Sequence, residues 1–174
     1  IVSLPRQDPS LFLNWQRTTS TGEFGLSTKY QEASTSSSEL NEAGLIVRDG
    51  TRKTQSLSGN WRSAISERSS LGASVDRTSV AYDSGTLTNY SNTSLSLNYN
   101  YLWSERIEPF FRISTSRYIP EGRMAISSNS TTLTGGLQVK VSETLDLTSQ
   151  AGSSKISGSG RNVLQGSIAV RYTG

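Results

Sequence analysis

The sequence predicts an all-β fold, an antiparallel up-and-down transmembrane β-barrel of about ten strands. Three observations predict it. Large apolar and small polar side chains alternate over most of the 174 residues, tight turns recur between the alternating segments, and no apolar stretch approaches the length of a membrane-spanning helix, which needs about 18 residues. A period of two is typical of a strand with two different faces, whereas a helix repeats every 3.6 residues.

The alternation is clearest between Ser94 and Trp103. In this segment the odd positions are large and apolar or aromatic, and the even positions are mostly small and polar. The pattern recurs at 57–65, 71–75, 111–113, 133–141 and 145–147, and at 164–172 it shifts to even positions. Each of these segments is therefore predicted to be a strand with one apolar face.

Turn signals divide the chain between these strands. Ser-Glu dipeptides lie at 38–39, 66–67, 104–105 and 142–143. Asp49-Gly50 and Thr21-Gly22 each favour a two-residue hairpin, because glycine tolerates the positive φ of the tightest turns. Ten strands are predicted, at 10–20, 23–34, 40–48, 51–65, 69–82, 92–103, 107–119, 131–141, 145–156 and 162–173.

Three hairpin segments resemble those of bacterial outer-membrane β-barrel proteins: Tyr99-Asn-Tyr-Leu-Trp-Ser-Glu-Arg106, Ile65-Ser-Glu-Arg-Ser-Ser-Leu-Gly72 and Val141-Ser-Glu-Thr-Leu-Asp-Leu147. In that class a Leu-Ser-Glu-Arg-like turn joins two alternating strands. The resemblance covers nearly the whole chain and concerns the architecture. It implies a location in the bacterial outer membrane and contact with its lipid.

With ten strands, both ends of the chain and all four Ser-Glu turns are expected on one side of the barrel. The longer polar stretches, 83–91, 120–130 and 157–161, then fall on the other side. Outer-membrane barrels have short periplasmic turns and longer external loops. We therefore expect residues 1–174 to form a single barrel domain, in which 1–9 is an N-terminal periplasmic segment.

The apolar face is expected to meet lipid, and the small polar face to line the interior. The candidate lumen-lining charges are Arg62, Asp76, Arg112, Lys140 and Asp146. Their charges of both signs fit either a constriction that selects solutes or internal salt bridges that fill the barrel. The candidate interfacial aromatic residues lie near predicted strand ends: Trp15, Trp61, Tyr101 and Trp103.

Composition argues against catalysis. The chain has no histidine and no cysteine, so the commonest general base and the thiolate ligands of metals are missing. Glu67, Glu105 and Glu143 repeat in turns, where they suit capping of turn amides. We predict no catalytic, cofactor-binding or metal site and no enzyme activity. The net charge of +3 and the lack of a long Lys/Arg run do not favour nucleic-acid binding.

Three functional hypotheses follow. The first is a narrow passive channel in the outer membrane. The second is a structural anchor or scaffold that holds other envelope protein subunits. The third is a soluble β-sandwich adhesin rich in serine and threonine, which would bury Leu97, Trp61 and Val139 between two stacked sheets.

Overall fold

The computed structural model describes residues 8–35, 50–83, 87–122, 126–157 and 162–172. These residues form nine strands: β1 (Ser10–Thr18), β2 (Gly22–Ser34), β3 (Thr51–Ser66), β4 (Ser69–Tyr82), β5 (Tyr90–Tyr101), β6 (Ile107–Pro120), β7 (Ser128–Lys140), β8 (Leu145–Ile156) and β9 (Asn162–Tyr172). Within the described ranges, no helix is long and apolar enough to cross a membrane.

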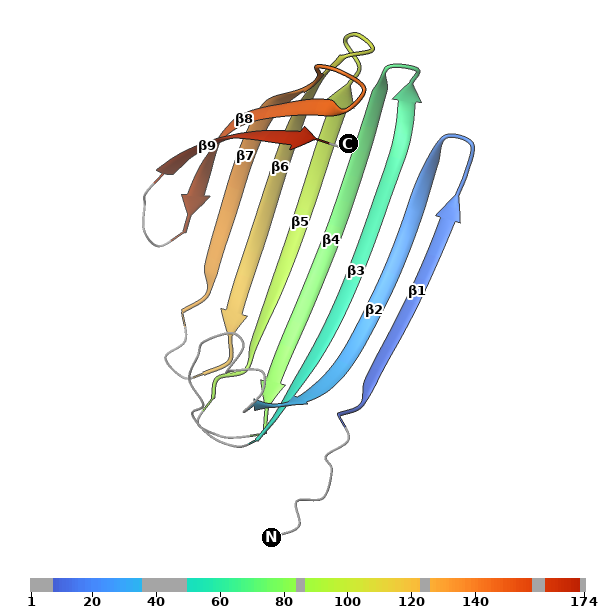
Figure 1. Ribbon diagram of the computed structural model, residues 1–174. Helices are drawn as coiled ribbons and strands as arrows, with labels where there is room; N and C mark the ends of the chain where they lie inside the picture. Colours follow the sequence, from blue (N-terminus) through green and yellow to red (C-terminus); the bar gives the residue numbers. More distant parts are fainter. Residues whose placement is uncertain (1–7, 36–49, 84–86, 123–125, 158–161, 173–174) are drawn as a thin grey trace.

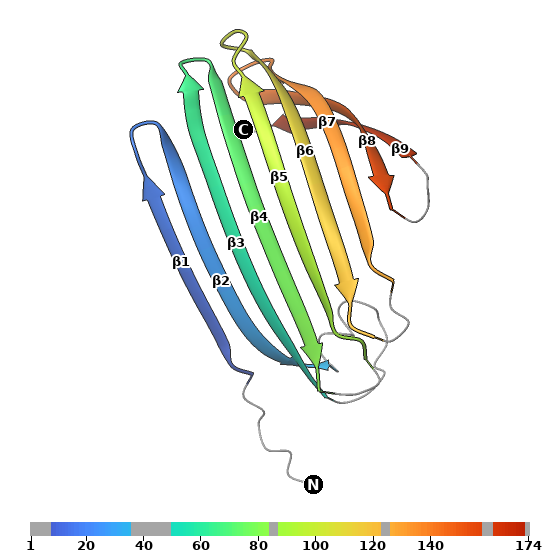
Figure 2. The ribbon, with the colours of Figure 1, turned by 180° about the vertical axis from the view of Figure 1, so that it is seen from behind.

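The strands form one antiparallel meander, in which each strand pairs with its neighbours in sequence, from β1 to β9 (Figure 1). This confirms the predicted all-β, up-and-down architecture. The sheet bends, so that β8 and β9 run across the direction of β1–β6 (Figures 1 and 2). Within the described residues the sheet is open, because β1 pairs only with β2 and β9 pairs only with β8.

The predicted strand 40–48 and the turn signals at Ser38-Glu39 and Asp49 lie outside the described residues. In the sheet, β2 pairs directly with β3 over its whole length, from Gly22 opposite Ser63 to Ser34 opposite Thr51. No further strand therefore lies between them. A tight turn joins the first two strands as predicted, but its centre is Ser20-Thr21 and not Thr21-Gly22: the Thr19 amide donates to the Gly22 carbonyl at 2.7 Å, and Gly22 is the first residue of β2.

The connections sort by length between the two ends of the sheet. Residues 19–21, 67–68, 102–106 and 141–144 join strands at what we call the tight-turn end, and the longer connections after β2, β4, β6 and β8 lie at the long-loop end. The start of β1 also lies at the long-loop end, where the Pro9 carbonyl accepts from the Glu32 amide at 2.9 Å. The prediction that both chain ends lie with the tight turns is therefore wrong for the N-terminal side, because the described strand number is odd.

The sheet has almost no buried apolar core. Among the described residues, Val80 is the single buried apolar side chain larger than glycine, whereas Leu97 remains 43% exposed and Trp61 41% exposed. A soluble β-sandwich buries the inner faces of two sheets against each other. Because the described strands form a single sheet, the β-sandwich alternative does not fit the structure.

Candidate functional site

Strand register divides the side chains between two faces. From β3 to β8, odd-numbered residues lie opposite odd-numbered residues, so that Trp61 pairs with Ala73, Ala73 with Leu97 and Leu97 with Ile113. On β2 and β9 the same face carries even-numbered residues such as Phe24. We call the face that holds Trp61 and Leu97 the outer face, and the opposite one the inner face.

The outer face carries an apolar band in the half of the sheet toward the tight turns. Its large members are half-buried or exposed in the isolated sheet: Leu26, Leu57, Trp61, Leu71, Val75, Leu95, Leu97, Tyr99, Phe111, Ile113, Leu133, Leu137, Val139 and Leu147. On β3 the band runs from Leu57 to Ile65, about 26 Å along the strand at about 3.3 Å per residue. This is the scale of the lipid-facing band of a transmembrane barrel, about 25 Å tall.

Of the four predicted interfacial aromatic residues, Tyr101 and Trp103 lie at the tight-turn end, whereas Trp61 lies in the middle of the apolar band on β3 and Trp15 one row further toward the long loops. Trp15, Trp61 and Tyr101 share the outer face, and the Trp15 ring meets the edge of Phe24 at a centroid distance of 5.5 Å. Trp103 lies in the connection between β5 and β6 and is 69% exposed. Amphipathic rings at one edge of an apolar band suit the boundary between hydrocarbon and water, and Tyr101 and Trp103 have that position whereas Trp15 and Trp61 do not.

The middle of the inner face is a floor of small hydroxyl side chains. One transverse row contains Ser27, Ser58, Asp76, Ser94, Ser116 and Ser130, and the next contains Asn60, Ser74, Ser96, Ser114, Thr132 and Ser154. Hydroxyl pairs bridge neighbouring strands, at 2.8 Å between Ser116 and Ser130 and at 3.0 Å between Thr132 and Ser154. Short polar side chains leave space above the sheet and offer hydrogen bonds to water.

Glycines on the inner face receive the larger side chains of adjacent strands. A Cβ on Gly72 would lie 2.5 Å from the side-chain oxygen of Asn98, its partner across β4 and β5. A Cβ on Gly136 would lie 2.5 Å from the Phe110 ring and 2.5 Å from the Ser149 carbonyl oxygen. Because the two glycines have no side chain, Asn98 and Phe110 can lie flat against the sheet. The inner face therefore projects little into the space above it.

All five predicted lumen-lining charges lie on the inner face. Arg62 and Arg112 belong to one transverse row, in which Gly72 and Asn98 separate them. Asp76 lies four residues along β4 from that row, about 13 Å away. Lys140 and Asp146 are direct cross-strand partners beside the tight turn between β7 and β8. The described sheet does not gather the five charges into one constriction.

A cavity of about 260 Å³ lies beside Arg112 on the inner face. Ser114, Thr134, Gln150 and Ser167 contribute to its polar lining, and the Gln150 amide donates to the Ser167 hydroxyl at 3.0 Å. The guanidinium thus shares a polar hollow with hydroxyl and amide groups. Sequence pattern indicated the face of Arg112 but not this hollow, which depends on how β6 to β9 curve.

Nearer the tight turns, a chain of amides crosses the inner face. The Asn98 side-chain amide donates to Asn100 at 3.4 Å, and Asn100 donates to a Glu108 carboxylate oxygen at 2.6 Å. A cavity of about 220 Å³ separates this chain from the tight turn of β3 and β4, with Arg62 and Arg68 in its wall. The inner face therefore offers both donors and acceptors to small polar solutes.

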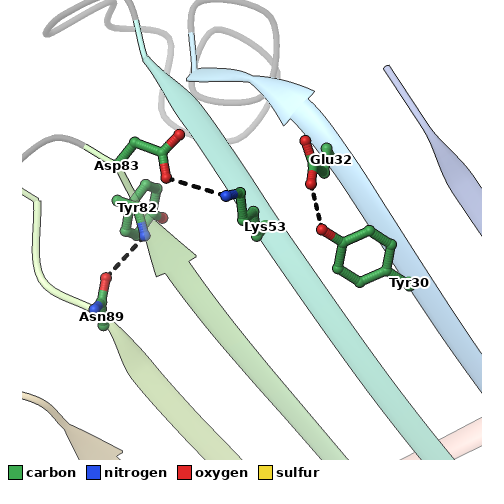
Figure 3. A network of polar contacts seen from close by, with 6 residues as sticks. All are labelled: Tyr30, Glu32, Lys53, Tyr82, Asp83 and Asn89. Carbon is green, nitrogen blue, oxygen red and sulfur yellow. Dashed lines mark hydrogen bonds and ion pairs between the residues drawn. The ribbon is translucent and has the colours of Figure 1, made fainter. Parts of the chain in front are cut away.

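At the long-loop end, polar contacts attach the strand ends to the connections (Figure 3). The Lys53 ammonium lies 3.5 Å from Asp83, and the Tyr82 amide donates to the Asn89 side chain at 2.8 Å. The Tyr30 hydroxyl donates to Glu32 on the same strand. The sequence did not predict this network, because most of its contacts depend on which strand ends lie side by side.

Aromatic rings also gather on the inner face at this end. Tyr90 and Tyr118 have ring centroids 5.4 Å apart, and Arg52 donates to the Tyr90 hydroxyl at 3.4 Å. These residues lie beside Val80, the most buried apolar side chain of the sheet. Large side chains thus cluster on the inner face at the long-loop end.

No known protein family matches the sequence, and no curated protein matches it. The structure is similar to two solved structures of OmpT, an outer membrane protein of Vibrio cholerae. A loop L8 deletion mutant aligns with a TM-score of 0.72 and 11% identity, over 95% of this chain and 53% of that one. OmpT expressed in the outer membrane aligns with a TM-score of 0.68 and 10% identity, over 95% of this chain and 56% of that one. The chain spans about half the length of the structures it matches, and over that length it has the strand-meander fold of outer-membrane β-barrels.

Proposed function

We propose that this chain forms the wall of a bacterial outer-membrane β-barrel whose serine-rich inner face lines an aqueous path for small polar solutes. The main observation in favour of this proposal is the contrast between the two faces of one sheet. The outer face has an exposed apolar band, and the inner face has hydroxyl, amide and charged side chains. Strands span a lipid bilayer with their apolar side outward and their polar side inward. The role is passive and non-catalytic, and its partners are membrane lipid and the solutes that pass.

The edges of the sheet set a condition on this proposal. An unpaired strand edge inside hydrocarbon leaves amides and carbonyls without partners, at several kcal/mol each. Because neighbouring strands are antiparallel, the first and the ninth strand, β1 and β9, run in the same direction. Antiparallel closure therefore requires an odd number of further strands between them, from residues outside the described ranges or from another chain.

Hydrogen exchange tests this condition. In phosphatidylcholine vesicles, we expect the amides of β1 and β9 to be protected to the same degree as those of β5, because both edges are then paired. The reference is the central strand of the same sample, so that lipid binding and chain folding are controlled internally. Rapid exchange confined to β1 and β9, with β5 protected, would show that the sheet stays open in lipid.

Conductance across a planar bilayer tests the path itself. In the described strands the inner face carries six basic side chains, Lys29, Arg52, Arg62, Arg112, Lys140 and Arg171, and four acidic ones, Glu23, Asp76, Glu108 and Asp146. We expect a stable conductance with a modest preference for chloride over potassium, because rings of pore-lining charge select ions of opposite sign.

The double variant Arg62→Gln with Arg112→Gln leaves four charges of each sign and is expected to abolish that preference. Arg17→Gln is the matched control, because Arg17 is on the outer face and its loss leaves the path unchanged. A purified, bilayer-inserted protein without conductance would contradict the channel. A selectivity that changes equally in the control would contradict the assignment of the two faces.

A scaffold is the second candidate, and it is favoured by the two sheet edges, which have no partner strand among the described residues. In this role, strands of a partner subunit would complete the wall, and the aromatic filling at the long-loop end would close the interior. Absence of conductance, together with edge protection that appears only when an envelope subunit is added, would support the scaffold over the channel.

A further inference from the structure

We propose that the outer face carries a binding site for the phosphorylated headgroup of a membrane glycolipid, centred on Arg77 just beyond the apolar band. The site rests on the proposed membrane placement, because it uses the face that meets lipid. It lies toward the long loops, and hence in the external leaflet, since the tight turns of outer-membrane barrels face the periplasm.

The geometry begins with a groove on β2, β3 and β4. Its volume is about 420 Å³, and two adjacent transverse rows of the outer face line it: Thr28, Leu57 and Arg77 in one, Tyr30, Gln55 and Ser79 in the other. The groove thus combines one guanidinium with hydroxyl and amide groups. Arginine binds phosphate through parallel N–H donors, and the hydroxyls and the amide suit a sugar.

Charge on the outer face favours an anion at this level. In the described strands this face carries five basic side chains and one carboxylate, that of Glu32, which accepts from Tyr30. Four of the five lie beyond or at the loop-side edge of the band: Lys53, Arg77, Arg117 and Lys155. Lys53 lies 3.5 Å from the Asp83 carboxylate and opposite Glu32, so the excess positive charge at this level comes from the other three. Basic side chains beside a bilayer surface attract anionic headgroups.

Arg77 and Arg117 share one transverse row, with Thr93 between them. Two strand spacings separate them, about 10 Å at about 4.8 Å per strand. Both side chains are exposed, so that both can reach a ligand on this face. A headgroup with two phosphates can therefore meet one guanidinium with each.

The apolar band continues directly below the groove. In the next row toward the tight turns, Leu26 and Val75 flank Gly59, and a Cβ on Gly59 would lie 3.2 Å from Val75 and 4.0 Å from Leu26. Acyl chains that descend from a headgroup in the groove would therefore lie on Leu26, Val75 and Leu57. This continuity selects a lipid rather than a free phosphate as the occupant.

The test measures binding of bisphosphorylated lipid A to the protein in dodecyl maltoside, by native mass spectrometry across a lipid titration. We expect Arg77→Gln to weaken binding about tenfold to a hundredfold, since hydrogen bonds to charged groups are the strong ones. Arg77→Lys keeps the charge and should lose less. Arg17→Gln is the matched control, an outer-face arginine near the tight turns, and should bind like the unmodified protein.

Two further arms separate the possible sources of binding. Lipid A without its phosphates should bind at least tenfold more weakly, and 10 mM inorganic phosphate should not displace the intact lipid. Equal binding of both lipids, displacement by inorganic phosphate, or equal weakening by Arg17→Gln and Arg77→Gln would each overturn the site. Insertion of every variant into phosphatidylcholine vesicles is checked separately, so that failure of the lipid site is distinct from failure of the membrane placement.

Discussion

A single charge placed on either face of β5 tests which face of the sheet meets lipid. Leu97 lies in the centre of the apolar band, in a row with Trp61, Ala73 and Ile113, and is 43% exposed. Its neighbour Ser96 points to the opposite face, in the hydroxyl floor. The two positions share a strand, a depth and a backbone environment, so that Leu97→Arg and Ser96→Arg differ mainly in the medium that the charge meets.

We expect Leu97→Arg to lower the free energy of unfolding in lipid by about 2–4 kcal/mol, the cost of arginine on the lipid face near the bilayer midplane. This corresponds to a change of about 30-fold to 900-fold in the folding equilibrium. Ser96→Arg should lower the free energy of unfolding by no more than about 0.5–1 kcal/mol, because its guanidinium stays hydrated on the inner face. Leu97→Ala removes the apolar side chain without adding charge and should fall between them.

The assay is reversible guanidinium unfolding in phosphatidylcholine vesicles, followed by the emission of the three tryptophans. A change of midpoint at constant slope reports stability alone. If Ser96→Arg costs as much as Leu97→Arg, the charge meets the same medium on both sides and the assignment of faces fails. If Ser96→Arg costs more, lipid contacts the serine side and the assignment is reversed.

Two further predictions use the same sheet. Gly136→Ala should destabilise the protein by about 1–3 kcal/mol, because the added Cβ overpacks against the Ser149 carbonyl. Gly135→Ala is the control: its Cβ would meet its nearest atom at 4.0 Å, and its stability should change by no more than about 0.5 kcal/mol. Equal unfolding midpoints for the two variants would contradict this packing. In the cysteine-free chain, Ser79→Cys should react with a membrane-impermeant maleimide in vesicles and Ala73→Cys should not. Equal labelling of the two would place the edge of the lipid elsewhere.

The division into faces could be predicted from the sequence because each strand alternates on its own. Arg62, Asp76, Arg112, Lys140 and Asp146 all lie on the predicted inner face, since a period of two decides the side of a residue once its strand is known. Which charges are neighbours could not be predicted in this way. That depends on register between strands, and register placed Arg62 and Arg112 in one row while leaving Asp76 about 13 Å away.

The hairpin of β3 and β4 shows why the register between strands could not be predicted from the sequence. Ser66 pairs with Ser69 across the turn, but from Ala64 opposite Ser70 onward the pairing is shifted by one residue, a bulge at Ile65. Without that bulge, the odd positions of β3 would share a face with the even positions of β4, and Trp61 would not lie beside Ala73. A one-residue slip moves every side chain to the other face. The bulge therefore keeps the apolar band continuous, and the turn sequence alone does not reveal it.

The groove at Arg77 was missed for a different reason. Alternation marks Arg77 as an outward residue in a strand whose other outward residues include Leu71 and Val75, and a lone arginine there looks like an exception to the apolar pattern. Only the cross-strand rows place it beside Thr28, Tyr30 and Gln55, beyond the edge of the band. The signal that a sequence offers is the run of polar outward residues that continues past each apolar segment toward the long loops.

The low apolar content of the chain follows from the same geometry. A soluble sheet protein needs apolar side chains on two facing surfaces, whereas this sheet carries most of them on one surface and only over part of each strand. β3 has 16 residues, about 53 Å at about 3.3 Å each, but its apolar band begins at Leu57, so in the proposed membrane placement its first six residues extend past the hydrocarbon. A content of 33% apolar residues is therefore enough for a thin apolar band on one face of long strands, and in the proposed membrane placement the polar remainder supplies the wet interior and the headgroup level of the outer face.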